Sequence, residues 1–173
     1  MKRSALLAAA AALAVLSGCA SLAEPSHTST GRKIAVRQIA NKSQQFGLED
    51  TLVGAVRDEF LHDGRYQLVP EGEAEDSVAI TITQYILTPL AYDVTLAPIT
   101  YKLRIIVDVQ MLERATNREL WKEENLEGSL TYPNQILAGG QTEAGAQATI
   151  WTVLAPMIVS RVADGFNAAP AVK

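Results

Sequence analysis

The stretch "YKLRIIVDVQML", residues 101–112, decides the fold, because large apolar side chains alternate along it with mostly polar ones. The apolar set is Tyr101, Leu103, Ile105, Val107, Val109 and Met111. An alternation of period two is typical of a strand that buries one face and leaves the other in contact with water. The stretch therefore predicts a long strand in a sheet whose second face is largely polar.

The flanking stretches extend this sheet. Residues 77–87, "SVAITITQYIL", alternate in the same way, and we expect one face to carry Val78, Ile80, Ile82 and Ile86 and the other to carry Tyr85. After residue 112, Asn117 tolerates a left-handed turn, so a third strand, from about Arg118 to Leu130, should pair antiparallel with the second. The three stretches predict an antiparallel meander.

Two segments with helical spacing bracket these strands. In the first, Leu48, Leu52, Val56 and Phe60 share one face, Gly47 precedes them, and Gly64 is a natural end. In the second, from about Thr142 to Phe166, the expected buried positions are Ala144, Ala148, Trp151, Ala155, Ile158 and Val162. Pro156 lies inside this segment, and we expect it to kink the helix because proline has no backbone N–H.

Two shorter alternating stretches, 33–39 and 65–69, predict further strands, and residues 71–76 form a charged turn that we expect to be solvated. The expected order is therefore β-α-β-β-β-β-α. This order predicts an α+β two-layer sandwich, in which two helices pack on one face of a mixed sheet of four to five strands.

The N-terminal residues differ in kind from this domain. Lys2 and Arg3 precede an apolar run that ends at Leu16. This run would span roughly 18 Å as a helix, well short of a hydrocarbon core of about 30 Å, so residues 1–18 are predicted to be a signal peptide. The expected organisation continues with a flexible tether at 19–31, the domain at 32–166 and a frayed tail at 167–173.

Cys19 is the only cysteine of the chain, so it cannot form an internal disulfide. The residues from Leu16 to Cys19, "LSGC", resemble the bacterial lipobox. This resemblance implies a diacylglyceryl thioether on Cys19, cleavage before it and acylation of the new N-terminus, with palmitate-type chains. Residue 20, which follows this cysteine, is alanine and not aspartate. The resemblance to proteobacterial lipoproteins then implies an outer-membrane location facing the periplasm. An ordinary buried cysteine is the alternative, but Cys19 precedes every predicted core element.

Composition and motifs argue against several classes of function. The formal net charge of −4 disfavours nucleic acid as a partner. The nucleophile-elbow, dinucleotide and phosphate-loop motifs are absent, and the two histidines, His27 and His62, have no neighbouring ligand set in the sequence. We therefore predict a protein that is not an enzyme and has no cofactor or metal. A small hydrolase, whose catalytic residues would meet only on folding, stays open.

Two features of the sequence are candidates for a binding role. The connection "TPLAYDVTLAPIT", residues 88–100, is unusually apolar: it either folds back over its own core or contacts a partner. The candidate contact residues are Leu90, Tyr92, Val94 and Leu96. Basic residues also gather on neighbouring strands, as a solvated face or as an anion site. The candidates for an anion site are Lys102, Arg104, Arg118 and Lys122, with Arg114 nearby.

Residues 31–166 resemble the LptE family of lipopolysaccharide-assembly lipoproteins. The matching stretches are "IAVRQIANKSQQFGLEDTLVGAVRDEF", "DGRYQLV", "AEDSVAITITQYILTPLAYD", "YKLRIIVDVQMLERATNRELW" and "EAGAQATIWTVLAPMIVSRVADGF". The resemblance implies a plug inside the LptD β-barrel that helps deliver lipopolysaccharide to the outer leaflet. On that basis we expect the 88–100 connection to contact the barrel and the four basic residues to meet lipid A phosphates.

A second resemblance leads to a different function. The segment 33–69 is also similar to periplasmic lipoprotein modules that bind cell-wall synthases or assemble secretion channels. Such a protein would regulate an enzyme or build a channel, and it would not transport lipid.

Overall fold

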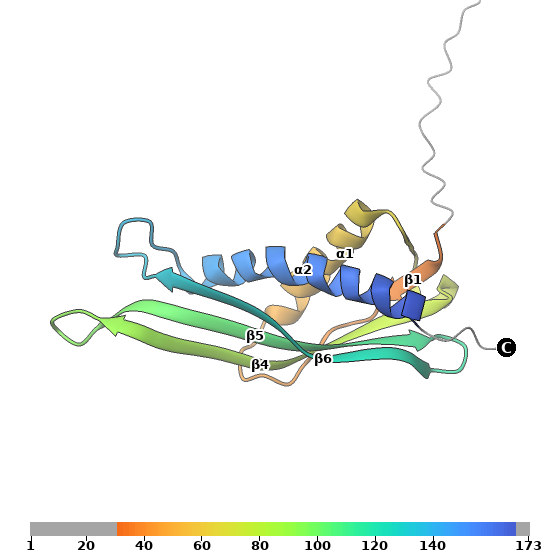
Figure 1. The fold of residues 1–173 in the computed structure, drawn as a ribbon, viewed down its shortest axis with the longest axis horizontal. Helices are drawn as coiled ribbons and strands as arrows, with labels where there is room; N and C mark the ends of the chain where they lie inside the picture. The colour runs from red at the N-terminus through yellow and green to blue at the C-terminus, as the bar shows by residue number, and fades with distance from the viewer. Residues whose placement is uncertain (1–30, 169–173) are drawn as a thin grey trace, which may run out of the picture.

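A mixed sheet forms one layer of the molecule and two helices form the other, as Figure 1 shows for the computed structural model. The structure describes residues 31–168. The signal peptide, Cys19, most of the tether and the last five residues lie outside the described residues, so the expectations for them stay predictions. The strand order is β3-β1-β4-β5-β6, and the short β2 also pairs with β4. The predicted α+β class, with both helices on one face, is confirmed.

The N-terminal part supplies the parallel side of the sheet. Strand β1 (Lys33–Val36) pairs in parallel with β3 (Gln67–Leu68) on one side and with β4 (Asp76–Tyr92) on the other. Strand β2 (Ala40–Asn41) continues along β4. Helix α1 (Leu48–Asp63) connects this region to β3, since parallel neighbours need a crossover.

The C-terminal part is the predicted meander. Strands β4, β5 (Pro98–Glu113) and β6 (Arg118–Pro133) pair antiparallel. The 17 residues of β4 reach roughly 55 Å at about 3.3 Å per residue, so the sheet is long and narrow. Helix α2 (Glu143–Ala168) lies lengthwise on it and continues through Pro156. The expected left-handed turn residue, Asn117, has a φ of 54°.

Helix α1 forms as its sequence predicts. Leu48, Leu52, Val56 and Phe60 are all buried. Gly47 and Gly64 bound the helix with left-handed backbones, which glycine adopts without steric cost, and the Gly64 N–H donates to the Phe60 carbonyl. The acidic residues Glu49 and Asp50 lie in the first turn, where the helix dipole favours negative charge.

Helix α2 is rotated relative to our expectation. Ala144 and Ala148 were expected to be buried but are exposed, while Ala146 and Ile150 are buried in their place. Trp151, Ala155, Ile158 and Val162 are buried as predicted. The helix crosses β6 at Gly128, where a Cβ atom would lie 2.6 Å from Leu154 Cγ, so only glycine allows this close approach. By length and composition α2 could cross a membrane, but half of that window is buried, as in a core helix.

A β-bulge corrects the predicted faces of β4. The register with β5 shifts between Ile82 and Gln84, and such an extra residue moves every later side chain to the opposite face. Tyr85 therefore faces α2, where its hydroxyl donates to the Glu143 carboxylate and accepts from the Gln147 amide. Ile86 therefore lies on the opposite face of the sheet, and not on the helix-facing side where we expected it.

Two connections also differ from expectation. Residues 88–100 are mostly not a loop, because β4 extends to Tyr92 and β5 starts at Pro98. The expected charged turn at 71–76 is a short 3-10 helix, Glu71–Glu73, after which Asp76 begins β4. Asp76 is fully buried, and its carboxylate Oδ2 lies 2.7 Å from Arg32 Nε. Burial raises the pKa of Asp76, and the Arg32 charge opposes this shift.

Candidate functional site

The β4–β5 hairpin projects beyond the helices (Figure 1), and large apolar side chains are exposed at its end. We define the hairpin tip as Leu90, Tyr92, Val94 and Leu96, all of which are exposed. Val94 has a relative exposure of 102% and Leu96 of 80%, so the tip does not fold back over the core. Of the two alternatives for this segment, the first is wrong.

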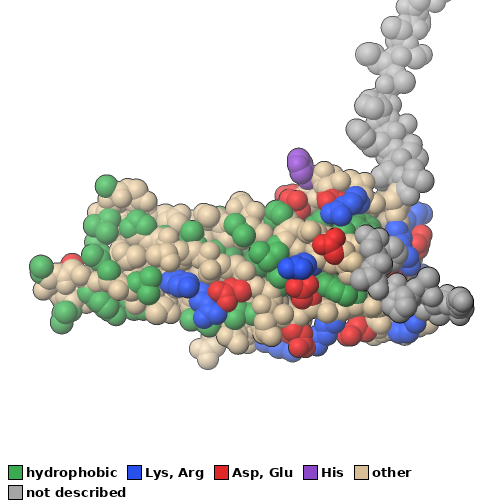
Figure 2. Space-filling model, in the orientation of Figure 1, with side chains coloured by type: hydrophobic (Ala, Val, Ile, Leu, Met, Phe, Trp, Pro, Cys, Tyr) green, Lys and Arg blue, Asp and Glu red, His purple; other side chains and the backbone are tan. Residues whose placement is uncertain are grey.

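Further apolar side chains are exposed at the same end of the molecule. The connection from β6 to α2 exposes Ile136 and Leu137, and the Asn134 N–H at its start donates to the Ile99 carbonyl of β5. Figure 2 shows hydrophobic side chains gathered at this end, whereas most charged side chains on the visible face lie further along the body. The molecule therefore has an apolar end and a charged end.

The hairpin tip has a defined shape. The Asp93 carboxylate accepts hydrogen bonds from the Thr95 hydroxyl and from the Thr95 and Ala97 backbone N–H groups. These bonds, led by the one from the Thr95 side chain, lower the pKa of Asp93. Leu96 has a φ of 65°, which costs a residue with a Cβ roughly 1–2 kcal/mol. The turn thus holds its apolar side chains in water at an energetic cost.

The four predicted basic residues do not form one cluster. Lys102 and Arg104 lie on β5 opposite Thr131 and Ser129, whereas Lys122 lies opposite Gln110 of β5. Six residues separate positions 104 and 110, a distance of roughly 20 Å along the strand. Lys102 and Arg104 therefore form one group, and Arg118 and Lys122 belong to another near the β5–β6 turn.

Most of these cations already contact a carboxylate. Arg104 Nε and an Nη atom lie 2.8 and 2.6 Å from the two Glu127 oxygens, a bidentate pair. This guanidinium lowers the pKa of Glu127, with a smaller contribution from Lys102. Lys122 pairs with Glu124, and Arg118 Nε lies 3.5 Å from a Glu113 oxygen. An anion bound here would have to replace a carboxylate.

No metal cluster is seen in the described part of the chain. Within residues 31–168 no group of three His, Cys, Asp or Glu side chains is placed to hold a metal ion. His62 is exposed in the last turn of α1.

Two comparisons with known proteins were informative about similarity. A family model described as LptE, lipopolysaccharide-assembly, matches residues 31–162. No curated protein matches the sequence significantly.

Among the solved structures with a similar fold are three bacterial proteins. A hypothetical protein from Chlamydia trachomatis is 14% identical with a TM-score of 0.59, and the match covers 80% of this chain and 99% of that one. A minor lipoprotein from Acinetobacter baumannii is 16% identical with a TM-score of 0.51, covering 82% and 96%. A variant PelC dodecamer from Paraburkholderia phytofirmans is 14% identical with a TM-score of 0.50, covering 75% and 87%.

Proposed function

Because the chain belongs to the LptE family of lipopolysaccharide-assembly proteins, we propose that it is an outer-membrane lipoprotein that plugs an LptD-like β-barrel and helps deliver lipopolysaccharide to the outer leaflet. It acts by binding and not by catalysis. Acyl chains on Cys19 hold it at the inner leaflet, on the periplasmic side.

The exposed hairpin tip is the observation that carries this proposal. Contiguous apolar side chains held in water are typical of surfaces that contact another molecule. The sheet face away from the helices instead carries ion pairs such as Arg104–Glu127, and a face of this kind suits the polar interior of an outer-membrane barrel. One body thus offers an apolar contact at its end and a polar surface along its length.

Capture of the full-length, tagged protein from native outer membranes tests this function. We expect an LptD-like barrel to co-purify. If a cell-wall synthase or a secretion-channel component is captured instead, the alternative function replaces this one.

The hairpin tip makes the capture experiment specific. Val94→Asp combined with Leu96→Asp should lower barrel recovery at least tenfold, since burying each apolar side chain is worth about 1.5–3 kcal/mol. Leu61→Asp combined with Val153→Asp is the matched control, because these side chains are also exposed, at 68% and 51%, but lie on α1 and α2. Equal losses in both variants would contradict a specific role of the tip.

The anion role of Lys102, Arg104, Arg118 and Lys122 is part of the same proposal. A lipid A phosphate would replace Glu127 on Arg104, because phosphate offers the same bidentate geometry with more charge. Arg104→Glu with Lys122→Glu should therefore weaken lipopolysaccharide binding about tenfold, as expected for losing charge-assisted hydrogen bonds.

Glu127→Gln provides the opposite test, because it frees Arg104 without changing the size of the side chain. We expect this variant to bind lipopolysaccharide more tightly than the wild type in a direct binding assay. If neither substitution changes the affinity, the anion site is not on this face.

A further inference from the structure

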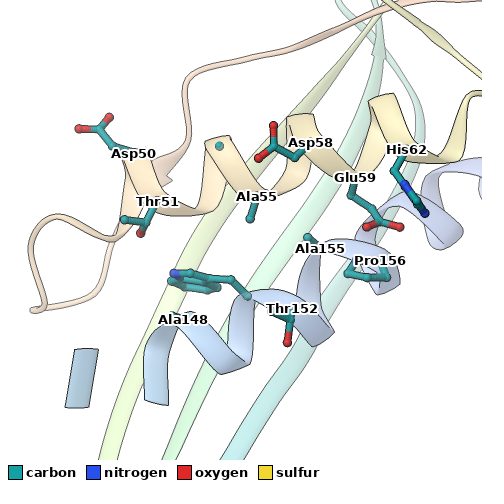
Figure 3. A pocket seen from close by; sticks show the side chains of 12 residues that line it. Asp50, Thr51, Ala55, Asp58, Glu59, His62, Ala148, Thr152, Ala155 and Pro156 are labelled. Atoms are coloured by element: carbon teal, nitrogen blue, oxygen red, sulfur yellow. The ribbon is translucent and has the colours of Figure 1, made fainter. Parts of the chain in front are cut away.

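A groove runs between the outer surfaces of α1 and α2, away from the hairpin tip and from the basic strand residues. Its volume is about 740 Å³. This lies within the roughly 300–1,000 Å³ that is usual for binding clefts. Figure 3 shows side chains of both helices facing each other across it.

The floor of the groove is apolar and is lined by small side chains. Gly54 and Ala55 contribute from α1, while Ala148, Ala155 and Pro156 contribute from α2. The ring of Trp151 also lines the floor and is otherwise buried. Because the facing residues are small, the two helices leave room between their outer surfaces.

The rim of the groove on α1 is acidic. Asp50, Asp58 and Glu59 line the groove, and within residues 31–168 none of them forms an ion pair. Some carboxylates elsewhere in the fold, such as Glu71 and Glu127, are paired with arginine. Figure 3 shows Glu59 reaching from α1 toward α2, with His62 beside it.

The α2 side adds hydrogen-bond acceptors but no charge. The helix carries no Asp, Glu, Lys or Arg from residue 144 to residue 160. Pro156 has no N–H, so the carbonyl of Thr152 lacks the donor that a helix normally supplies, and both residues line the groove. The groove therefore combines an apolar floor, carboxylates and a backbone acceptor. The floor suits apolar side chains of a partner, while the carboxylates and the carbonyl suit its positive charges and hydrogen-bond donors.

We propose that this groove binds a basic amphipathic helix of a partner polypeptide. Such a helix lays its apolar side chains on the floor, while its lysines or arginines reach the Asp50, Asp58 and Glu59 carboxylates. The charge of the rim selects basic over acidic helices, because like charges repel at an interface. The inference does not depend on the barrel proposal, since the groove and the hairpin tip share no residue.

A binding assay with a defined probe tests the groove. The probe is a fluorescent synthetic peptide of about 14 residues, four helical turns, with leucines on one face and lysines on the other. We expect saturable binding to the full domain by fluorescence anisotropy. Asp58→Lys with Glu59→Lys should weaken it at least tenfold, and Ala148→Trp should do so by filling the groove.

Matched controls separate site binding from general attraction. Glu73→Lys with Glu119→Lys makes the same change of net charge at two exposed glutamates outside the groove. Ala144→Trp adds the same ring one turn earlier on α2, at an exposed position that does not line the groove. Unchanged binding in both controls supports the proposal. Absence of saturable binding to the wild type, or equal losses in test and control variants, would overturn it.

Discussion

A chain that carries a conventional cleavable signal peptide in place of residues 1–18, and serine in place of Cys19, is expected to leave the membrane fraction entirely. Each buried CH₂ of an acyl chain contributes about 0.8 kcal/mol, and two or more chains anchor a protein stably. The net charge of −4 offers no compensating attraction to anionic lipids. Detergent phase partitioning of both chains measures the effect.

The replacement of the signal peptide matters for this test. With its own signal peptide, an unprocessed Cys19 variant would keep the apolar run that ends at Leu16, which can itself hold a membrane. Mass spectrometry of the wild-type N-terminus supplies the control by detecting the acylated cysteine. An unmodified thiol on a soluble wild-type protein would contradict lipid anchoring.

Phe60→Ala is expected to destabilise the domain by about 3–5 kcal/mol, the usual cost of removing a large buried aromatic side chain. Phe60 is fully buried in α1, and its ring meets that of Tyr66 edge to face, with centroids 5.9 Å apart and planes at 86°. The substitution removes this contact and the contribution of Phe60 to the packing of α1 in the core, while Leu48, Leu52 and Val56 stay in place. Urea denaturation followed by circular dichroism measures the free energy of unfolding.

Phe46 allows the same substitution to be made outside the core. Its side chain is 87% exposed, so Phe46→Ala should change the free energy of unfolding by no more than about 0.5 kcal/mol. A similar loss in both variants would show that the core around α1 is not packed as the structure has it.

Helix α1 and the odd-numbered face of β5 could be predicted because a single period runs unbroken through each. Leu52, Val56 and Phe60 define a face that Asp50, Arg57 and Asp58 do not interrupt. Helix α2 lacks such contrast, since it has no charged residue between positions 144 and 160. Its orientation therefore depends on tertiary contacts, such as the close approach at Gly128, and the sequence pattern placed Ala144 and Ala148 on the wrong side.

The bulge in β4 could not be predicted for a related reason. In "TITQYIL" the alternation breaks at Gln84, a polar residue at a position where the period expects an apolar one, but this break does not by itself show that Thr83 is an extra residue. The face of Tyr85 is set by its pairing with Ile105 of β5 and by its hydrogen bonds to α2. The Arg104–Glu127 pair is hidden in the same way, because 23 residues separate the two in sequence and only the strand register brings them together.

The place where the chain enters the sheet has a mechanical consequence. Under the lipid-anchoring proposal, tension from the membrane reaches the domain through Arg32 and then along β1. Because β1 lies between β3 and β4, a pull directed along β1 would shear the hydrogen bonds on both of its edges together instead of peeling them one by one. The contact between Arg32 and the buried Asp76 would break in the same event, so the attachment end would resist rupture.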